Sequence, residues 1–329
     1  MDGDAVKAAR ERSGRTQEEF AAWLNSLSGR KYDRSRVSRW ETGAERIPAD
    51  VVGMIQLGQL TFERSGRCRT VSVGNMKGGV GKTETSINQA FVLARAGART
   101  LIIDADSQGN ASRHVGISRG EIRRLEEEGK TLYHALTGRV PIKDVVRETG
   151  VPNLHVVPSS IALALAEREL AAEPDRTRMR DMLAGVTEHY DYILIDCSPS
   201  LGVVTVNVLS ASDYVLVPVQ TEPYAIDGFV HLRSTIDNVR DRANDELKIL
   251  GIVPTMYNAR QSQDRASLDD IRRDAKRHGV PVFEAIPRAT ICAQAAAANR
   301  ITLDADPGTP GLFTYIEIAV SLGGITYGA

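Results

Sequence analysis

The chain has 329 residues, of which 42% are hydrophobic and 25% are charged, and its formal net charge is −1. This composition excludes a disordered or fibrous chain, and the balanced charge by itself indicates no charged partner. No apolar run reaches the roughly 18 residues that a membrane-spanning helix needs. The three cysteines form no CxxC pair, which indicates a reducing, cytoplasmic compartment.

Residues 1–62 predict a small domain built only of short helices. Thr16 and Glu19 have the spacing of a capping box at a helix start, and an apolar stripe at helical spacing follows them. The polar and basic residues 63–69 predict a linker. The chain is therefore expected to divide into this helical domain and a larger domain over 70–329.

Within residues 5–58, the segments VKAARERSGRTQEEFAAWL, SRVSRWETG and IPADVV resemble helix-turn-helix domains of the Cro and phage-repressor type. In such domains the second helix of the motif lies in the major groove of DNA. The resemblance implies that Gln17 contacts a phosphate. It also implies that five residues face bases or backbone: Arg34, Ser35, Arg36, Ser38 and Arg39. The long loop at 27–33 leaves open which residue leads into the groove, and a protein-interaction module is the alternative.

After Thr70 the pattern changes to short apolar runs separated by helical stretches. The runs lie at 70–73, 100–104, 154–158, 191–196, 213–219, 247–253 and 281–286. Such runs, alternating with helices, predict an α/β fold with a mostly parallel, doubly wound sheet covered on both faces. The stretch 117–150 is polar and irregular, and it predicts no defined element.

The segment KGGVGKT at 77–83 follows the first apolar run and precedes a long helical stretch. Glycines let backbone N–H groups approach an anion, and the following helix N-terminus favours negative charge. Lys82 is placed to reach the β- and γ-phosphates of a nucleotide, and Thr83 to bind Mg²⁺. The predicted nucleotide-binding residues are Lys77, Gly78, Gly79, Val80, Gly81, Lys82 and Thr83. A glycine-rich turn with solvated lysines is the alternative.

KGGVGKT, with its extra Lys77, resembles the deviant Walker A loop of the ParA and MinD group of P-loop ATPases. DADSQGNAS at 104–112 and DYILIDCSPSLG at 191–202 resemble the later acidic motifs of ParA-type DNA partition ATPases. VLVPVQTEPYAIDG, GIVPTMYNAR and AIPRATICAQA follow in the order of that family. The resemblance covers about 70–322 and implies a P-loop fold that binds ATP and Mg²⁺.

The resemblance implies roles for three strand-end carboxylates and the first loop lysine. Asp106 would position the attacking water, Asp104 would hold the hydration shell of Mg²⁺, and Asp196 would act on Mg²⁺ as the Walker B acid. Lys77 would cross an ATP-bound dimer interface and act in trans. Each strand-end aspartate has a helix N-cap as its alternative role.

The adenine base is expected near Pro254, Thr255, Met256, Pro287 and Arg288, again by resemblance. Glu84 departs from the family, because a second threonine usually stands there near the α-phosphate.

Family members bind DNA without sequence preference through basic residues near their C-terminal helices. The helical stretch 264–279 carries a basic face made of Arg272, Arg273, Lys276 and Arg277. Several aspartates share this stretch, so a solvated, charge-balanced face is the alternative. Ile291 stands where the family often has an arginine used for DNA, so the DNA surface could be weaker or lie elsewhere.

We therefore predict an Mg²⁺-dependent ATPase for plasmid or chromosome segregation. It would form a homodimer in the ATP state, bind non-specific DNA and answer to a ParB-like centromere-binding partner. The N-terminal domain would bind an operator and repress its own operon, or would fix the protein on its own DNA. The expected location is cytoplasmic and nucleoid-associated, with no membrane contact. The alternatives are a nucleotide-switched transcriptional regulator and a positioning ATPase for another cargo.

Overall fold

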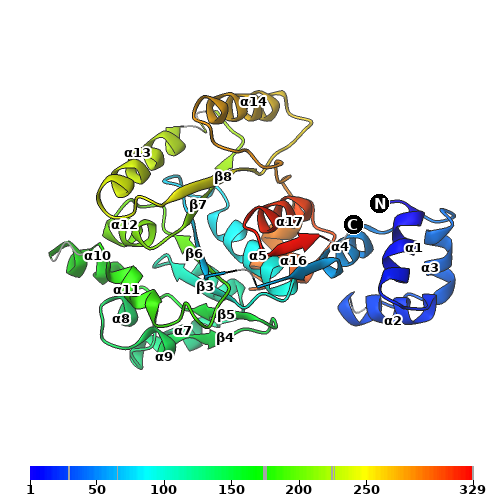
Figure 1. Cartoon of the computed structure of the whole chain (residues 1–329), viewed down its shortest axis with the longest axis horizontal. Coiled ribbons are helices and arrows are strands. Elements are labelled where there is room, and N and C mark those ends of the chain that lie inside the picture. The colour runs from blue at the N-terminus through cyan, green and yellow to red at the C-terminus, as the bar shows by residue number, and fades with distance from the viewer. Residues whose placement is uncertain (29, 65, 173–175, 224, 226, 328–329) are drawn as a thin grey trace.

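The computed structural model describes the chain except for residues 29, 65, 173–175, 224, 226 and 328–329. It consists of a small helical lobe at the N-terminus and a larger α/β body (Figure 1). Part of the motif predicted at 215–228, namely Tyr224 and Ile226, lies outside the described residues. No described helix has both the length and the apolar character needed to cross a bilayer.

The helical lobe is built from α1 (Gly3–Arg12), α2 (Gln17–Ser28), α3 (Arg34–Glu41) and the start of α4 (Ala49–Gly58). The predicted capping box is confirmed, because the Thr16 N–H donates to Glu19 Oε2 at 2.8 Å and the Glu19 N–H donates to Thr16 Oγ1 at 3.3 Å. Val37 and Trp40 are fully buried and fix α3 against the other helices.

One asparagine of α2 forms hydrogen bonds with the segment that leads into α3. Asn25 Nδ2 donates to the Tyr32 carbonyl at 2.8 Å, and Asn25 Oδ1 accepts from the Tyr32 N–H at 2.6 Å. The Tyr32 hydroxyl in turn donates to Asp50 Oδ2 at 2.9 Å. The bonds with Asn25 satisfy the backbone N–H and carbonyl groups of Tyr32, which would otherwise need other partners. They hold α3 in a defined position even though the connection before it is long.

Among the residues that the structure describes, the body contains a seven-stranded sheet with the order β4-β5-β3-β6-β2-β7-β8, in which only β4 is antiparallel to its neighbour. Its strands are β2 (Arg69–Val73), β3 (Thr100–Ala105), β4 (Arg147–Glu148), β5 (Leu154–Val157), β6 (Tyr192–Cys197), β7 (Tyr214–Gln220) and β8 (Lys248–Thr255). This confirms the mostly parallel sheet.

Six of the seven predicted runs become these strands, but the run 281–286 does not. It bonds β8 at separate points without a continuous ladder. The Ile252 N–H donates to the Pro281 carbonyl at 2.8 Å, the Phe283 N–H donates to the Ile252 carbonyl at 2.9 Å, and the Ile286 N–H donates to the Pro254 carbonyl at 2.8 Å. Pro281 has no N–H to continue a ladder, which limits how far pairing extends at this edge.

Helices cover both faces of the sheet, as predicted. Along β6, Leu194 packs into one apolar cluster while Ile193 and Ile195 pack into another, because successive side chains point to opposite faces. One face is covered by α5 (Lys82–Arg95), α16 (Thr302–Ala305) and α17 (Leu312–Ser321). The other is covered by α8 (Leu132–Leu136), α10 (Leu163–Ala172), α11 (Arg178–Ala184), α12 (Val203–Ser210) and α13 (Asp227–Arg242).

The polar stretch 117–150 is more ordered than its sequence indicates. It holds α7 (Arg119–Glu127), α9 (Ile142–Val145) and β4 besides α8. Ser118 caps α7 by accepting the Glu121 N–H at 3.2 Å. The shorter of these elements have no clear period in the sequence, while α7 is amphipathic and buries Leu125. Short α6 (Asn110–His114), α14 (Ser262–Arg277) and α15 (Thr290–Ala297) complete the body.

The predicted linker is bound to the body rather than extended away from it. β1 (Leu60–Phe62) pairs antiparallel with β9 (Ile325–Tyr327), and neither strand was predicted. Arg64 and Arg67 then form ion pairs with Asp191 at 3.2 Å and Asp213 at 2.7 Å. The boundaries 1–62, 63–69 and 70–329 stay a prediction.

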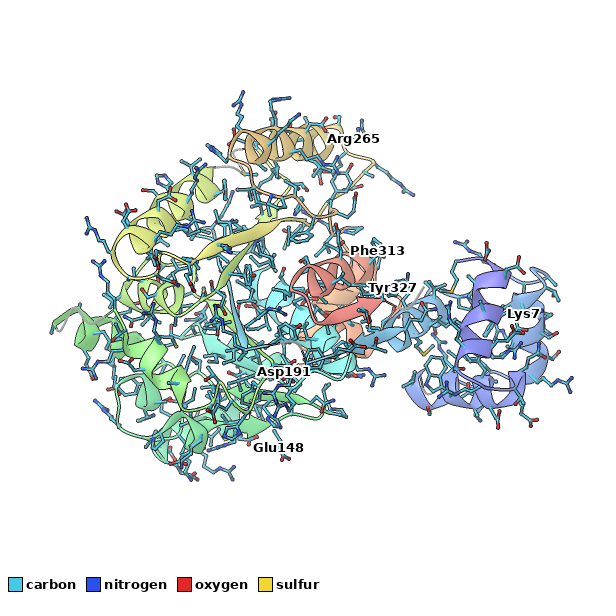
Figure 2. All side chains as sticks on the ribbon, viewed as in Figure 1. Lys7, Glu148, Asp191, Arg265, Phe313 and Tyr327 are labelled. Atoms are coloured by element: carbon cyan, nitrogen blue, oxygen red, sulfur yellow. The ribbon has the colours of Figure 1, made fainter. Side chains whose placement is uncertain are left out.

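Helix α4 joins the lobe to the body. Its Leu57 packs into the same apolar cluster as α5 and α17. A Cβ at Gly53 would lie 1.8 Å from the Pro307 carbonyl oxygen, and a Cβ at Gly308 would lie 2.5 Å from the Asp50 nitrogen. Glycines at both positions therefore allow the two backbones to touch, and Figure 2 shows Phe313 and Tyr327 of the body near this junction.

Candidate functional site

The loop between β2 and α5 has the geometry of an anion-binding turn. Gly79 and Gly81 have φ values of 76° and 88°, in the left-handed region that glycine tolerates. Gly81 is the N-cap of α5, so the helix begins at Lys82 with its free N–H groups facing the loop. The predicted strand, glycine turn and helix are confirmed in that order.

Hydrogen bonds from residues outside this loop hold it in place. Asn75 Nδ2 donates to the Pro218 carbonyl at 2.7 Å, and Asn75 Oδ1 accepts from the Lys77 N–H at 3.0 Å. Thr255 Oγ1, at the end of β8, donates to the Val80 carbonyl at 2.8 Å. The loop is thus preorganised from β7 and β8. Asn75 was not predicted to take part, and Thr255 was predicted near the base rather than at this loop.

Lys82 spans the loop that it closes. Its side chain is buried, and Nζ donates to the Lys77 carbonyl at 2.8 Å. Burial lowers the pKa of Lys82, while the charge of Asp196 acts in the opposite direction. An ammonium group in this position is available to a phosphate oxygen that enters the turn.

Asp196, at the end of β6, lies under the start of α5. Its Oδ2 accepts from Thr83 Oγ1 at 2.7 Å, and its Oδ1 accepts from Ser86 Oγ at 3.0 Å. Burial, and then the charge of neighbouring Asp104, raise the pKa of Asp196. A carboxylate destabilised in this way gains from a nearby cation, so Thr83 and Asp196 fit Mg²⁺. Ser86 was not predicted, although it lies one helical turn after Lys82 on the same helix.

Asp104 is the sheet neighbour of Asp196, and its side chain is fully buried. Its Oδ2 accepts from both the N–H (2.8 Å) and the hydroxyl (2.6 Å) of Ser112, and the Ser112 hydroxyl also accepts from the Ser159 N–H at 3.0 Å. Burial raises the pKa of Asp104, while the bonds from Ser112 lower it. In the structure Asp104 fastens the start of α6, and its role toward Mg²⁺ stays a prediction.

Asp106 follows β3 in a tight turn at the same edge of the sheet. Its Oδ1 accepts from the Gln108 N–H at 3.0 Å, and its carbonyl accepts from the Gly109 N–H at 3.0 Å. Unlike Asp104, it is only partly buried. Asp106 is thus not sealed inside the core, as contact with a water would require.

The side chain of Lys77 is paired within its own chain. Its Nζ forms an ion pair with Glu222 Oε1, just after β7, and both side chains are partly exposed. The predicted contact with a partner's nucleotide would require this pair to open. Glu222 lies in the motif VLVPVQTEPYAIDG, but no role was predicted for it.

The two segments predicted near the base lie side by side. The Ile286 N–H donates to the Pro254 carbonyl at 2.8 Å, and the Arg288 N–H donates to the Tyr257 carbonyl at 3.0 Å. Met256 has a φ of 55°, which few non-glycine residues adopt. The structure therefore brings Pro254 and Met256 next to Pro287 and Arg288, while their contact with adenine stays a prediction.

Glu84, the departure within the loop motif, is turned toward its own helix and α15. Its Oε1 accepts from Asn88 Nδ2 at 2.7 Å. Burial raises the pKa of Glu84, while the hydrogen bond from Asn88 opposes this. A carboxyl group with a raised pKa carries less negative charge, which reduces its repulsion toward a phosphate in the loop.

The predicted basic face of α14 is exposed, and it lies at the far side of the body from β4 (Figure 2, where Arg265 and Glu148 mark the two sides). Arg273 pairs with Asp270 at 2.7 Å and Arg277 pairs with Asp274 at 3.3 Å. Arg272 approaches Glu284 at 4.0 Å, and Lys276 is exposed. The aspartates share this face, so its net positive charge is smaller than the arginines alone indicate.

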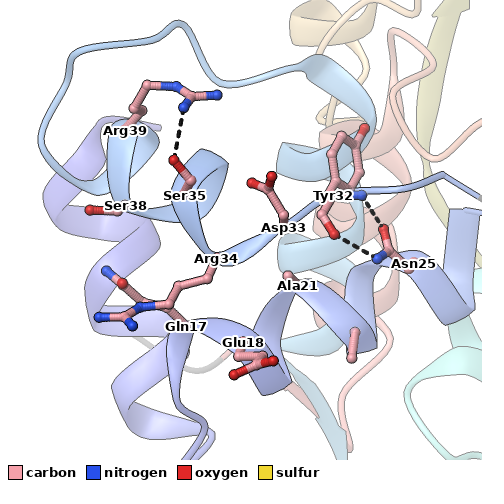
Figure 3. A pocket seen from close by; sticks show the side chains of 11 residues that line it. Gln17, Glu18, Ala21, Asn25, Tyr32, Asp33, Arg34, Ser35, Ser38 and Arg39 are labelled. Carbon is pink, nitrogen blue, oxygen red and sulfur yellow. Dashed lines mark hydrogen bonds between the residues drawn. The ribbon is translucent and has the colours of Figure 1, made fainter.

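In the helical lobe, α2 and α3 enclose a groove with a volume of about 830 Å³ (Figure 3). It is lined by Gln17, Arg34, Ser35, Ser38 and Arg39 among others. Arg34 and Ser35 are exposed, and Arg39 donates to Ser35 Oγ at 3.0 Å.

Gln17 and Arg36 are engaged within the lobe. Gln17 Nε2 donates to Glu41 Oε2 at 2.8 Å. Arg36 donates to Glu45 at 2.9 Å and stacks over the rings of Tyr32 and Trp40. Both side chains would have to exchange these partners to meet DNA, and all six predicted DNA contacts of the lobe stay predictions.

No group of three or more His, Cys, Asp or Glu in the described part of the chain forms a metal site. This is compatible with Mg²⁺, because proteins hold Mg²⁺ through one or two carboxylates together with waters and substrate phosphates.

Comparisons with known proteins agree with this geometry. Residues 68–249 match the family model of an AAA domain. The chain is 40% identical over 256 residues to the chromosome partitioning protein ParA of Caulobacter vibrioides, which covers 76% of this chain and 92% of that protein. It is 36% identical over 252 residues to the sporulation initiation inhibitor protein Soj of Bacillus subtilis, which covers 76% and 96%.

A solved structure is similar in fold and in sequence. Cobyrinic acid a,c-diamide synthase of Mycobacterium smegmatis, with bound ADP and magnesium, is 33% identical with a TM-score of 0.62, covering 71% of this chain and 91% of that one. The fold and the site together define a P-loop ATPase with a mostly parallel sheet.

More particularly, the chain belongs to the ParA family of partition ATPases, and it is a nucleotide-hydrolysing enzyme of that kind. This confirms the family predicted for 70–322, and ATP with Mg²⁺ as its cofactors agrees with the ligands of the similar structure. The helix-turn-helix resemblance of residues 5–58 stays a prediction.

Proposed function

We propose that the chain is an Mg²⁺-dependent ATPase that segregates DNA and forms a homodimer around two ATP molecules. One observation carries this proposal. The buried carboxylate of Asp196 accepts hydrogen bonds from Thr83 and Ser86, directly beneath a glycine turn that contains Lys82. Mg²⁺ would neutralise charge on the phosphate oxygens in this place.

The loop residues have distinct roles in this proposal. Backbone N–H groups of Gly78–Thr83 hold the phosphates, and Lys82 moves its ammonium from the Lys77 carbonyl to a phosphate oxygen. Thr83 turns its hydroxyl from Asp196 to the metal, which leaves that carboxylate free to act on the metal's waters. Asp106 orients the attacking water, and Pro254, Met256, Pro287 and Arg288 surround the base.

Lys77 makes catalysis depend on the dimer. In the single chain its ammonium pairs with Glu222. We propose that ATP-driven association replaces Glu222 with the partner's phosphates, so that the lysine acts in trans as an arginine finger does. Hydrolysis would then require two copies, and release of phosphate would return Lys77 to Glu222.

DNA binding is assigned to the exposed face of α14. Arg272, Arg273, Lys276 and Arg277 would neutralise backbone phosphates without reading sequence. The ATP-state dimer would thus lie on the nucleoid in the cytoplasm, and a ParB-like partner would stimulate hydrolysis and release it.

The helical lobe is proposed to bind an operator in front of the chain's own operon. Arg34, Ser35, Ser38 and Arg39 line the groove between α2 and α3 and supply the contacts, with Gln17 on a phosphate and Arg36 released from Glu45. The close packing of α4 on the body specifically favours a second function as a nucleotide-switched transcriptional regulator. A positioning ATPase for another cargo is the third candidate.

The test measures ATP turnover and particle size together. Purified chain is incubated with Mg-ATP, with and without random-sequence duplex, while light scattering reports its mass. We expect turnover to rise with DNA and mass to double with ATP. ATP-dependent dimers without turnover would contradict the ATPase and leave the switched regulator.

Two further arms test the DNA contacts. Replacing Lys276 and Arg277 by Ala should weaken duplex binding and flatten its salt dependence, whereas Arg95→Ala, an exposed arginine at the end of α5, should not. Footprints on the region upstream of the chain's gene should differ between ADP, ATP and no nucleotide. Identical footprints would contradict a nucleotide-sensitive operator complex.

A further inference from the structure

A second basic pocket lies beside the loop that carries Asp106. It has a volume of about 340 Å³ and is formed by the loop after β3, the helices α6 and α7, and the residues after β5. Its charged lining residues are Arg113, Arg119, Arg123 and Glu126. Neither the ATPase motifs nor the predicted DNA surfaces include these arginines.

Two of these arginines are uncommitted. Arg119 and Arg123 are one helical turn apart on α7, so both can point to the same side, and both are exposed. Within the described residues neither has an ion pair or a side-chain hydrogen bond. By contrast Arg124, on another face of the same helix, lies near Glu121 at 3.8 Å and Glu128 at 3.7 Å.

The inner wall of the pocket offers hydroxyl groups that have no partner. Ser159 and Ser160 line it, with side-chain oxygens that are buried and make no hydrogen bond among the described residues. Ser159 is 0% exposed and Ser160 is 3% exposed. A buried hydroxyl without a partner is costly unless a ligand or water completes it.

The third arginine joins the pocket to the neighbouring loop. Arg113 Nε donates to the Gly109 carbonyl at 3.3 Å, and its Nη2 contacts Asn110. Gly109 also donates its N–H to the Asp106 carbonyl at 3.0 Å. An occupant held by Arg113 would therefore contact the turn that positions Asp106.

We propose that this arginine pocket, defined by Arg113, Arg119, Arg123, Ser159 and Ser160, binds a phosphoryl group. Guanidinium groups pair with phosphate oxygens through two parallel hydrogen bonds, and the hydroxyls add further donors. Three guanidiniums and two hydroxyls exceed what a carboxylate accepts and suit the several oxygens of a phosphate. The phosphoryl group comes either from free inorganic phosphate or from a DNA backbone that the exposed arginines reach.

The binding test uses the full chain with its nucleotide loop filled by Mg²⁺ and a non-hydrolysable ATP analogue. Inorganic phosphate is titrated and followed by ³¹P NMR. Replacing both Arg119 and Arg123 by Ala should weaken binding by at least about tenfold, while Arg124→Ala, the matched control on the same helix, should leave it within about twofold. All three side chains are exposed, so folding is unaffected, and a thermal melt checks this.

A second arm replaces phosphate with a short random-sequence duplex. If DNA is the source, the double variant should lower the slope of log affinity against log salt by about 2, one for each lost contact. A loss confined to either arm supports the pocket and identifies the source. If the double variant binds both phosphate and the duplex as tightly as the wild type does, the proposal is overturned.

The outcome is separable from that of the proposed ATPase. If the analogue fails to bind, the proposed function fails, and the same titration is repeated with Lys82→Ala, in which the nucleotide loop has lost its phosphate-binding lysine. The expected losses in the double variant are then unchanged, because they depend only on the arginine pocket.

Discussion

The hydroxyl of Ser112 is expected to be the most costly single atom to remove near the site. It donates to Asp104 Oδ2 at 2.6 Å and accepts from the Ser159 N–H at 3.0 Å, and all three residues are fully buried. A hydrogen bond to a charged group contributes about 1.5–3 kcal/mol, and a stranded buried N–H costs about 1–3 kcal/mol. Ser112→Ala should therefore lower the free energy of unfolding by about 3–5 kcal/mol near neutral pH.

The loss should depend on pH in a defined direction. Burial already raises the folded-state pKa of Asp104 above its unfolded value of about 3.9, and Ser112 partly opposes this. Between those two values the native chain holds a proton that the unfolded chain has released, so stability falls as pH rises. Without Ser112 the folded pKa rises further and this window widens. Below the folded-state pKa of Asp104 the native carboxyl is protonated with or without Ser112, and the loss should shrink to about 1–3 kcal/mol, the cost of the stranded Ser159 N–H.

The assay is urea denaturation of wild type and Ser112→Ala at pH 4 and pH 8, followed by circular dichroism. Ser210→Ala is the matched control, because Ser210 is equally buried but its hydroxyl only returns to the Val206 carbonyl of its own helix at 2.8 Å. The control should lose about 1 kcal/mol or less at both pH values. Equal losses in the two variants, or a loss from Ser112→Ala that does not grow with pH, would refute the reasoning.

Three other substitutions test separate features. Asp106→Ala should keep ATP binding and dimer formation but stop hydrolysis, as phosphate release would show; turnover above a tenth of wild type would contradict its role. Glu222→Gln should free Lys77 and strengthen the ATP-dependent dimer, measured by light scattering, by up to about fivefold, which is the range of a partly exposed ion pair. A weaker dimer would argue against the proposed release of Lys77 from Glu222. Gly53→Ala should cost about 1–3 kcal/mol in urea denaturation because of the Pro307 carbonyl, whereas Gly120→Ala, with open space in α7, should cost nothing. Equal losses of stability from Gly53→Ala and Gly120→Ala would exclude a close contact between α4 and the body.

Hydrophobic periodicity and the positions of the glycines were sufficient to predict the main sheet and the loop at 77–83. Apolar runs such as 191–196 are buried on both faces in a parallel sheet, so they stand out against polar helices. The positive φ values at positions 79 and 81 require glycine, so the turn can be recognised from the residue types in the sequence. The capping box at Thr16 is likewise a local pattern that needs no knowledge of the rest of the chain.

The features that the sequence did not reveal depend on distant partners. β1 and β9 have three residues each and pair across almost the whole chain, so neither has a period of its own. Glu222 meets Lys77, and Ser112 meets Ser159, only because parallel strands end at one edge of the sheet. The strand expected at 281–286 does not form. Its apolar residues pack beside β8, but its backbone does not continue a hydrogen-bonded ladder with that strand.

Isothermal titration calorimetry of Mg-ATP into the wild-type chain and into Lys82→Ala tests most directly whether the turn at 77–83 holds a triphosphate. We predict saturable binding of one ATP per chain that requires Mg²⁺, and its loss when the ammonium that now donates to the Lys77 carbonyl is removed. A wild-type chain that takes up no Mg-ATP, or a Lys82→Ala chain that binds it equally well, would contradict the assignment.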